Sequence, residues 1–449
     1  MWKKTAGCWP SLGLAYIASV LEHDGHRVAY IDCSAEHYTI NDMRQVLKDC
    51  KGFDYIGLTA TTPLINNALR IADIAKQEIP GVKVVVGGVH ASVMPDEVLS
   101  NKCVDFVAVD EGEQTIRELI NGARPEDILG LCFKKDGQII KNDLRPLIKD
   151  LDEIPPPAYH LMPIKKYYPA PGTYKRLPVM TIFSTRGCPG RCTFCYRCFR
   201  GVIRKRSAKN IIEEVKILQK DYGIKGLTIV DDTFTIFKDV VKEFCNLILS
   251  EGLDISWSCM TRVDCVNEEL LKLMKRAGCF QILFGVESGD EEILKAINKK
   301  ISLTQVQEIV KLARKIGIET RATFMFGNQG ETEETIKKTI DFAIKLDPDM
   351  AQFNIAIPYP GTYLFDWAKE RGYIKSFNWD DYNLSDAVLD LPGLSRDKLQ
   401  YYYRLAHRKF FFRPKWILRR ALQIRNWAQI EQNVKGLFAL LGFVRLNQD

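Results

Sequence analysis

The 449-residue chain contains no run of about 18 uncharged apolar residues, the length that a helix needs to cross a bilayer. Its opening residues, Met1 to Lys4, lead into a mixed segment that is too short for the apolar core of a signal peptide. Its 13 cysteines lack the spacing of a disulfide framework, which suits reduced thiols. We therefore expect a cytoplasmic protein, and 46% hydrophobic residues are enough for about two or three domain cores.

A net positive charge is lacking outside the last part of the chain. Residues 396–449 contain twelve Lys and Arg against three Asp and Glu, a surplus larger than the net charge of +7 of the whole chain. Pro414 should interrupt any single helix there. We expect a helical segment whose aromatic side chains cap the preceding domain while its basic groups reach solvent. The alternative is peripheral contact with anionic lipid or an acidic partner, whereas no recognition motif supports nucleic acid.

Strand-like and helix-like segments alternate from Leu12 onward. We expect strands over residues 26–32, 55–60, 83–88 and 105–109. This alternation predicts βαβ units and a parallel sheet, whose ligands lie at the carboxyl ends of the strands. The small and polar residues at those ends are Thr61, Thr62, Gly87, Gly88, His90 and the DEGE stretch 110–113.

Residues 131–177 break this alternation. A hairpin is expected around Lys135 to Gly137, and Pro155, Pro156 and Pro157 follow in succession. Proline fixes φ and bars helix, so the stretch predicts a stiff connector between an N-terminal domain, residues 1–130, and a second domain.

The second domain repeats a strand–helix unit six times. Strands are expected at 178–184, 227–232, 255–261, 281–289, 319–327 and 351–358. A helix over 303–315 should open with Ser302 and Gln305 as a capping box. Six such units predict a partial (β/α)6 barrel over residues 178–395, with its chemistry at the carboxyl ends of the strands.

Three cysteines follow the first strand of this series. Cys188, Cys192 and Cys195 form a CxxxCxxC array. Structural zinc takes four ligands, and Cys198 could be the fourth, but such a site has no open position for chemistry. Three thiolates on a four-iron four-sulfur cluster leave one iron free for a small ligand. Three buried structural cysteines are the remaining alternative.

With Phe194 before its last cysteine, the array resembles the signature of the radical S-adenosylmethionine enzymes. Segments of residues 178–395 that fit this resemblance are RSAKNIIEEV, VDDTF, GVESGDEEIL, GNQGETEET and PYPGT. The resemblance implies that the three cysteines hold a 4Fe-4S cluster, whose open iron is chelated by the amino and carboxylate groups of S-adenosylmethionine. An electron from a donor such as flavodoxin or ferredoxin then cleaves the sulfonium to a 5′-deoxyadenosyl radical.

The resemblance also implies residues that hold S-adenosylmethionine. Asp231 and Asp232 stand where the methionine ammonium is received, although the two could instead cap a helix. Glu287 and Ser288 match the position that binds the ribose. Arg262 would meet the methionine carboxylate or form an ordinary surface ion pair.

The adenine would be held by apolar and backbone groups. Phe194 would pack near it, and Phe326 and Gly327 would offer backbone contacts. The usual proline of the GxPGET pattern is Gln329 here, which leaves the following Gly330 and Glu331 in place.

The N-terminal domain resembles the Rossmann-like, flavodoxin-like cobalamin-binding domain that precedes the radical domain in one branch of these enzymes. The resemblance rests on three segments: PSLGLAYIASVLEHDGHRVAYID, VVVGGVHASVMPDEVL and DEGEQTIREL. It implies that the corrin ring lies between the domains, lined by Thr61, Thr62, Gly87, Gly88, His90, Glu111, Gly112 and Glu113. The DxHxxG pattern that supplies an axial histidine is absent, so His90 would touch the periphery of the ring or only cap a turn.

Two features depart from this pattern. Asp110 replaces the first glycine of GEGE, and only nine residues precede Pro10, where the family has a strand and a proline-rich loop. In a sheet of order 2-1-3-4-5 that strand is central, so its neighbours would be left unpaired. We expect the natural start to lie upstream; a degenerate domain is the alternative.

The resemblance implies methyl transfer from methylcobalamin to an unactivated carbon of a small-molecule or lipid-like substrate. Ring formation or rearrangement is the alternative on the same architecture. A methylthiotransferase-like enzyme is disfavoured, because there is neither a second cysteine triad in the N-terminal half nor a β-barrel RNA domain. A non-enzymatic cluster scaffold is the third possibility.

Overall fold

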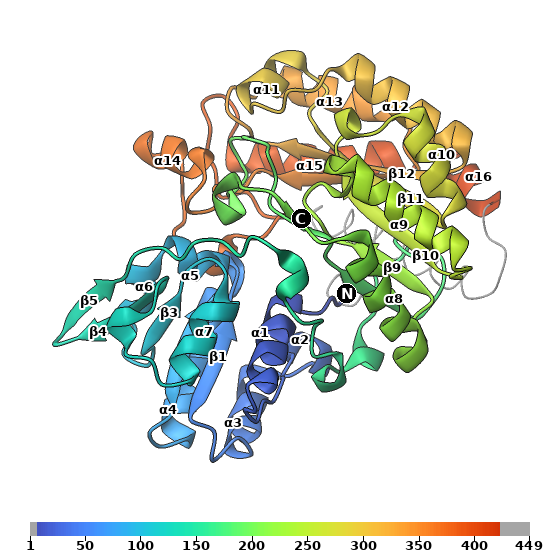
Figure 1. The fold of residues 1–449 in the computed structure, drawn as a ribbon. Helices are drawn as coiled ribbons and strands as arrows, with labels where there is room; N and C mark the ends of the chain where they lie inside the picture. The colour runs from blue at the N-terminus through green and yellow to red at the C-terminus, as the bar shows by residue number, and fades with distance from the viewer. Residues whose placement is uncertain (1–6, 423–449) are drawn as a thin grey trace.

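The computed structural model describes residues 7–422, which form two α/β units side by side (Figure 1). Each unit is built on one main sheet. A two-stranded ribbon, β7 (Thr185–Arg186) with β8 (Arg204–Lys205), stands apart from both. The expected α/β architecture, a Rossmann-like domain followed by a partial barrel, is confirmed.

The N-terminal sheet has five strands in the order β1-β2-β3-β4-β5. The first three, β1 (Tyr55–Thr59), β2 (Lys83–Gly87) and β3 (Phe106–Ala108), are parallel. The last two, β4 (Leu131–Lys135) and β5 (Gln138–Lys141), form the expected hairpin, and β4 pairs antiparallel with β3. Because of this pairing, the N-terminal sheet continues to Lys141, past the expected boundary at residue 130.

Seven helices accompany this sheet in the described part of the chain. The sheet's buried apolar residues, such as Val84, Val86 and Val107, pack in the same core as the apolar side chains of these helices. The helices are α1 (Leu12–His23), α2 (Cys33–Glu36), α3 (Ile40–Lys48), α4 (Ile65–Glu78), α5 (Val89–Val93), α6 (Pro95–Ser100) and α7 (Gly112–Ile120).

The strand expected over residues 26–32 is wrong. The segment has no ladder partner, and β1 pairs only with β2. Its burial nevertheless alternates, with Val28 and Tyr30 half-buried and Arg27 and Ala29 exposed. The local pattern of a strand is therefore present, but the neighbour that would make it one is not among the described residues.

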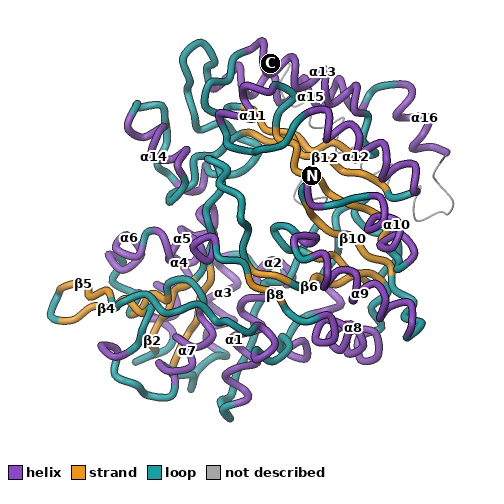
Figure 2. Tube along the Cα trace, turned by 45° about the horizontal axis from the view of Figure 1, so that its top comes forward, coloured by secondary structure: helices purple, strands orange, loops and turns teal. Residues whose placement is uncertain are grey.

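Residues 142–178 form the connector between the units, and Figure 2 shows this stretch mainly as loop. Three short 3-10 turns interrupt it, at Leu151–Glu153, Tyr159–Leu161 and Ile164–Lys166. The prolines exclude a longer helix here. An isolated bridge joins Tyr168 to Cys8, so the connector also holds the start of the described chain.

The second sheet has six parallel strands in the order β13-β12-β11-β10-β9-β6. All six coincide with expected strands, because fully buried parallel strands read as apolar runs between turn residues. They are β6 (Val179–Ile182), β9 (Gly226–Ile229), β10 (Ser256–Thr261), β11 (Cys279–Glu287), β12 (Glu319–Phe326) and β13 (Met350–Ile355).

Helices cover the outer face of this open barrel (Figure 1). Trp257 of β10 is fully buried there among Phe234 and Phe244. Ser302 caps its helix as expected, accepting a hydrogen bond from the Gln305 backbone. The helices are α8 (Ala208–Tyr222), α9 (Lys238–Ser250), α10 (Glu268–Arg276), α11 (Glu291–Ala296), α12 (Leu303–Ile316), α13 (Glu333–Leu346) and α14 (Tyr363–Glu370).

The basic C-terminal segment begins with two helices, α15 (Arg396–Phe411) and α16 (Pro414–Leu422), and the break between them falls at Pro414 as expected. Phe410 packs on Phe353 of β13, and Asp347 pairs with Arg413 and Arg419. These contacts fit a cap on the barrel. Peripheral membrane contact stays a prediction, and residues 423–449 lie outside the described part.

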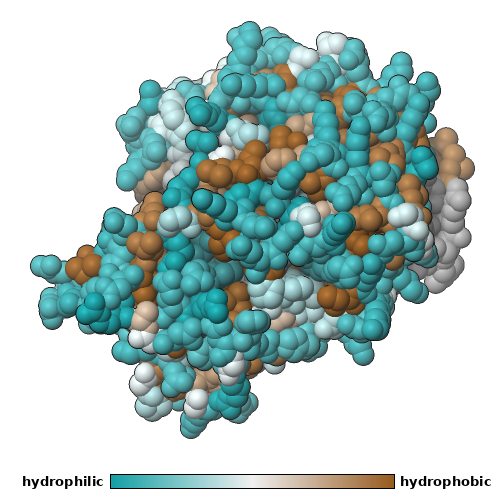
Figure 3. All heavy atoms as spheres, viewed as in Figure 1, coloured by the Kyte–Doolittle hydropathy of each residue, from teal (hydrophilic) through white to brown (hydrophobic). Residues whose placement is uncertain are grey.

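No helix within residues 7–422 is long and apolar enough to cross a membrane. The view in Figure 3 shows a mostly hydrophilic surface, with apolar side chains gathered along the junction of the two units. The candidate site lies at this junction.

Candidate functional site

The cysteine loop, residues 187–198, leaves the ribbon strand β7 at the carboxyl end of β6. Gly187 has φ of 95°, and a Cβ there would come within 2.3 Å of the Val202 carbonyl oxygen, so glycine lets the two ribbon backbones approach. Gly190 lies among the thiols, since its Cβ would be 3.3 Å from Cys188 Sγ and 3.9 Å from Cys192 Sγ. The loop thus wraps around a space that the thiols share.

The three thiols interact with one another electrostatically. Burial raises the pKa of Cys195, and the nearby Cys192 and Cys188 raise it further. A bound metal replaces the thiol proton and so removes this penalty. No group of three or more His, Cys, Asp or Glu in residues 7–422 is gathered as a single ion requires. An iron–sulfur cluster is larger than one ion and needs thiolates that are set wider apart.

The loop also separates two cavities. Cys192 and Cys195 line a cavity of about 340 Å³. Cys198 lines a different cavity, of about 660 Å³, together with Phe199 and Asp232. Cys198 therefore faces away from the space shared by the other thiols, in keeping with a set of three ligands.

Glu287 ends β11 in a bulge beside the cysteine loop. Its φ is 73°, and the register with β12 shifts between Gly285 and Glu287. The carboxylate accepts hydrogen bonds from Lys299 Nζ at 3.0 Å and from Thr323 Oγ1 at 3.2 Å. A Cβ on Gly285 would come within 2.6 Å of Glu287 Oε1 and 2.8 Å of Lys299 Nζ, so this glycine makes room for the pair.

Lys299 is buried next to the cysteine loop. Burial opposes its charge, but Glu287 and Cys192 outweigh this effect, so the net pKa of Lys299 is raised. The site therefore holds a fixed cation and a fixed carboxylate, which suit a ligand that carries both an ammonium and a carboxylate.

The other residue expected at the end of β11, Ser288, points elsewhere. Its fully buried hydroxyl lies 3.1 Å from Thr339 Oγ1 and accepts a hydrogen bond from the Asp290 backbone. These bonds join β11 to α13 on the outer side of the sheet. Its role toward a ribose stays a prediction.

Arg262 forms the ion pair that was one of the two roles considered for it, and its contact with the methionine carboxylate stays a prediction. Its guanidinium donates to the two carboxylate oxygens of Asp264 at 2.9 and 2.8 Å and to the Lys299 carbonyl at 3.0 Å. The same group borders the cysteine loop, since a Cβ on Gly190 would lie 4.0 Å from its Nη1. The ion pair is formed, and the cation remains next to the thiols.

The two aspartates after β9 differ in their surroundings. Asp231 is buried and accepts hydrogen bonds from the Ser184 and Thr185 backbones and from the Ser184 hydroxyl. Burial raises its pKa to about 6 against these bonds. Asp232 instead lines the larger cavity. Asp231 thus fixes the turn after β6, and Asp232 has the carboxylate that is available to a ligand.

The residues that are expected to hold the adenine lie close to one another. Phe194 packs with Met325, one residue before Phe326, in a small apolar cluster. The backbone N–H groups of Gly327 and Asn328 both donate to one carboxylate oxygen of Glu331, at 2.7 and 3.0 Å. Burial raises the pKa of Glu331 to about 8. Glu331 therefore holds the loop that follows β12.

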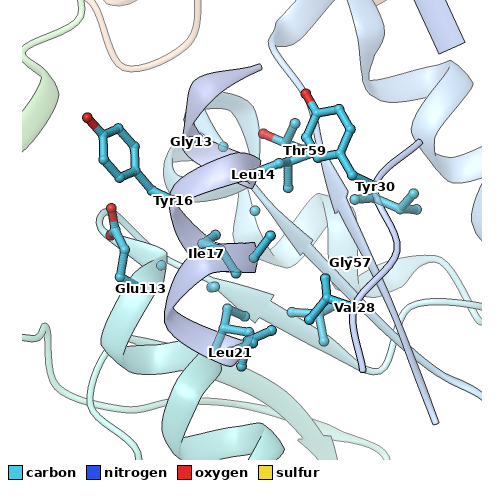
Figure 4. Close-up of a pocket in the computed structure, with 18 of the residues that line it drawn as sticks. Gly13, Leu14, Tyr16, Ile17, Leu21, Val28, Tyr30, Gly57, Thr59 and Glu113 are labelled. Carbon is cyan, nitrogen blue, oxygen red and sulfur yellow. The ribbon is translucent and has the colours of Figure 1, made fainter. Parts of the chain in front are cut away.

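The larger cavity opens at the carboxyl ends of the N-terminal strands. Gly87, Gly88, Glu111, Gly112 and Glu113 line it, facing Arg186 and Phe199 of the second unit. Gly88 has φ of 92°, and a Cβ there would come within 2.7 Å of Thr59 Oγ1. The cavity continues between α1 and β1, where Figure 4 shows Leu14, Ile17 and Leu21 on the side of α1 that faces Val28 and Tyr30.

The two glutamates of the DEGE stretch hold the units together. Arg186 donates to Glu111 at 2.7 Å and to Glu113 at 2.6 Å, and Arg204 donates to both oxygens of Glu111. All four side chains are buried or nearly so. Burial raises the pKa of Glu111, but its arginine partners reverse this, so the net pKa is lowered. Both glutamates line the expected cofactor crevice, with their charges neutralised by arginine.

Three other residues expected around the corrin ring are not on this lining. Thr61 is exposed at the start of a 3-10 turn. Thr62 is buried, 3.2 Å from His90 Nδ1. The fully buried His90 ring packs edge-on against Trp379, with centroids 5.3 Å apart. His90 thus joins the two units, and its contact with a cofactor stays a prediction.

Sequence reasoning missed Lys299, Arg186 and Arg204 as site residues. No local motif marks them: Arg186 and Arg204 gain their roles from Glu111, far away in the chain, and Lys299 gains its role from Glu287, twelve residues before it. The capping pattern after β12 could have drawn attention to Glu331, which stands before a helix but serves the preceding loop.

Comparisons with known proteins agree with this geometry. A model of the radical SAM superfamily matches residues 182–343, and a model of the B12 binding domain matches residues 2–120. The chain is 38% identical to an uncharacterized methyltransferase of Pyrococcus horikoshii, over 95% of this chain and 93% of the relative. It is 29% identical to an anaerobic magnesium-protoporphyrin IX monomethyl ester cyclase of Rubrivivax gelatinosus, over 90% and 74%.

A solved structure shares the fold. The radical S-adenosylmethionine methyltransferase TsrM from Kitasatospora setae, solved with cobalamin and a 4Fe-4S cluster, superimposes with a TM-score of 0.68. The match covers 82% of this chain and 74% of TsrM at 17% identity. Motifs, fold and relatives lead to one conclusion: the chain belongs to the radical S-adenosylmethionine superfamily, in the branch of enzymes that carry an N-terminal cobalamin-binding domain.

Proposed function

We propose that this enzyme transfers a methyl group to an unactivated carbon of a small organic substrate, with cobalamin as the methyl carrier. The observation that supports it best is the cysteine loop, which forms a shared wall between two cavities. Cys192 and Cys195 face one cavity, and Gly187, Cys198 and Phe199 line the other. Two cofactor sites would therefore lie within one loop's thickness of each other.

The chain's own residues fit the groups that the family uses. Cys188, Cys192 and Cys195 would hold the cluster, and Glu287, at the end of β11 beside the loop, would bind the ribose of S-adenosylmethionine. When bound, the cluster supplies the electron for sulfonium cleavage, and cobalamin supplies the methyl group. A ferredoxin or flavodoxin would deliver that electron.

Neighbouring residues would position these groups. Phe194 and the loop that Glu331 holds would orient the adenine, so that the carbon that becomes a radical faces the barrel. Gly87 and Gly88 leave the backbone bare where a large planar ring would approach. Arg186 and Arg204 hold the two walls of the crevice at a fixed spacing.

Ring formation is the second candidate, because a cyclase is among the relatives. Product analysis separates the two. A methyltransferase that takes its methyl group from S-adenosylmethionine must release S-adenosylhomocysteine as well as 5′-deoxyadenosine. We expect reconstituted enzyme with cobalamin and a reductant to form both products. Formation of 5′-deoxyadenosine alone would favour the cyclase, and formation of neither would contradict the proposal.

A further inference from the structure

The inner face of the six-stranded sheet carries side chains that are only partly buried. Residues alternate along each strand between the buried outer face, which packs on helices, and this inner face. On β12, Thr320, Ala322 and Phe324 are buried, whereas Arg321 and Thr323 remain partly accessible. Partly accessible residues of the neighbouring strands are Thr228, Met260, Leu283, Gly285, Gln352 and Asn354.

Arg321 is a cation on this face, near the start of β12. It pairs in register with Leu283 on β11 and with Met350 on β13. Glu287, at the cluster end, contacts Thr323, the next residue of β12 on the same face. Arg321 therefore lies one pleat further from the cluster than Thr323, which is about 7 Å along the strand.

No carboxylate within the described residues forms an ion pair with Arg321. Its one hydrogen bond runs from Nη2 to Gln352 Oε1, at a long 3.4 Å. Burial lowers the pKa of the guanidinium to about 10, with no charged neighbour to oppose it, so the group stays charged at neutral pH. A guanidinium has five N–H donors, and most of them are unused here.

The acids of the inner face are already engaged. Glu287 binds Lys299 and Thr323. Glu319, two residues before Arg321, accepts from Gln281, and burial raises its pKa. Gln281 also donates to the Gly172 carbonyl, so the connector closes this end of the barrel. An anion for Arg321 would have to enter from the cluster end.

We propose that Arg321 binds an oxyanion of the substrate, a carboxylate, phosphate or phosphonate, through its planar fork. Desolvating a cation without a counter-ion is costly, and proteins bear such a cost where a ligand supplies the missing charge. Arginine matches two oxygens of such a group at once. The substrate class follows from this assignment, which rests on the proposed function: an acid whose apolar part contacts Met260 and Leu283.

Phenylphosphonate, which combines an oxyanion with an apolar ring, is a direct probe. Isothermal titration of the reconstituted full-length enzyme should show saturable binding, whereas the neutral dimethyl ester should not bind. Arg321→Gln should weaken binding at least tenfold, and Arg321→Lys should weaken it less. Arg276→Gln, on the exposed surface of α10, is the matched control and should bind as the unchanged enzyme does.

Thermal melting separates a binding role of Arg321 from a structural role, because the two roles predict different changes in melting temperature. Removing a partly buried charge that has no counter-ion should leave the melting temperature of Arg321→Gln equal or higher, whereas loss of a structural contact would lower it. Any of four results would overturn the assignment: equal binding by Arg321→Gln, equal binding of the ester, no saturable binding, or a clear fall in melting temperature. Failure of the unchanged enzyme to cleave S-adenosylmethionine would instead contradict the proposed function, because phosphonate binding does not depend on cleavage.

Discussion

The two sheets of this enzyme differ in how completely their strands are paired. In the six-stranded sheet all six strands expected from the sequence are paired, whereas next to the N-terminal sheet the expected strand 26–32 has no ladder partner among the described residues. In the N-terminal sheet, β1 pairs only with β2, and its other edge borders the cavity that extends along α1. Helices form next to both sheets, so local sequence pattern suffices for the helices, while a strand also requires its partner.

The complete sheet should support the cluster site by itself. Replacing Cys188, Cys192 or Cys195 singly with Ala should abolish the brown chromophore and all cleavage of S-adenosylmethionine, because each thiolate would hold one iron. Cys198→Ala should leave both largely intact, since Cys198 faces the other cavity. Absorption spectra and 5′-deoxyadenosine assays provide the test. Complete loss of the cluster in Cys198→Ala would contradict a three-cysteine site.

The link between the sheets should have the next largest effect. Arg186→Met would remove a positive charge that neutralises the buried carboxylates of Glu111 and Glu113. We therefore expect a loss of roughly 3–5 kcal/mol in the free energy of unfolding. Arg176→Met is the control, because its partner Asp254 is exposed and the pair should contribute less than about 1 kcal/mol. Urea denaturation measures both. Equal losses would mean that the interface charges act as surface pairs do.

The incomplete sheet should limit cobalamin binding. We expect the 449-residue chain to bind cobalamin tightly enough for turnover when the cofactor is in excess, but less tightly than a chain whose β1 is paired on both edges. Joining an apolar strand of about five residues and a short loop ahead of Met1 should tighten binding by about a hundredfold, or roughly 2.7 kcal/mol. Absorbance titration measures this effect. Equally tight binding by the chain without the added strand would show that the sheet needs no further partner.

Such an extended chain also allows the ligation of cobalt to be examined. We expect electron paramagnetic resonance of its cob(II)alamin form to show no nitrogen splitting from protein, since His90 is buried against Trp379. A nitrogen signal lost in His90→Ala would contradict this expectation.

A pH-dependent effect concerns Glu331 in the complete sheet. Its pKa of about 8 in the folded state lies above the ordinary value of 4.5, so folding favours its protonated form. This contribution to stability is full below about pH 4.5 and is lost as the pH rises through 8, with a slope of at most about 1.4 kcal/mol per pH unit. Glu331→Gln should remove that slope in denaturation curves recorded from pH 5 to 8. An unchanged slope would show that Glu331 is ionised.

Much of the architecture could be predicted from the sequence. All six barrel strands were found, because buried parallel strands are short apolar runs that end at glycine or polar residues. Residues 26–32 have the same appearance, yet a strand cannot be assigned without its neighbour. The prediction of the domain boundary at residue 130 failed for a related reason. Only the pairing of β4 with β3 shows that the hairpin belongs to the N-terminal sheet.

The site was predictable in position and less so in detail. Strand ends and the cysteine array located the loop, but the direction of a side chain depends on tertiary packing. Adjacent residues therefore point to opposite sides of the sheet: Glu287 faces the inner side, and Ser288 binds Thr339. No sequence pattern marks Lys299 or Arg321, because their surroundings in the fold distinguish them. Lys299 lies next to a carboxylate, and Arg321 does not.

The buried pairs of Glu111 and Glu113 with Arg186 and Arg204 have a consequence for dividing the protein. A cut within the proline-rich connector would produce two fragments, one with two uncompensated acids on its face and the other with two uncompensated bases. Each fragment would have to hydrate charges that the intact enzyme keeps dry. Each domain is therefore expected to need either its partner or the replacement of these charges to reach the stability that it has in the intact enzyme.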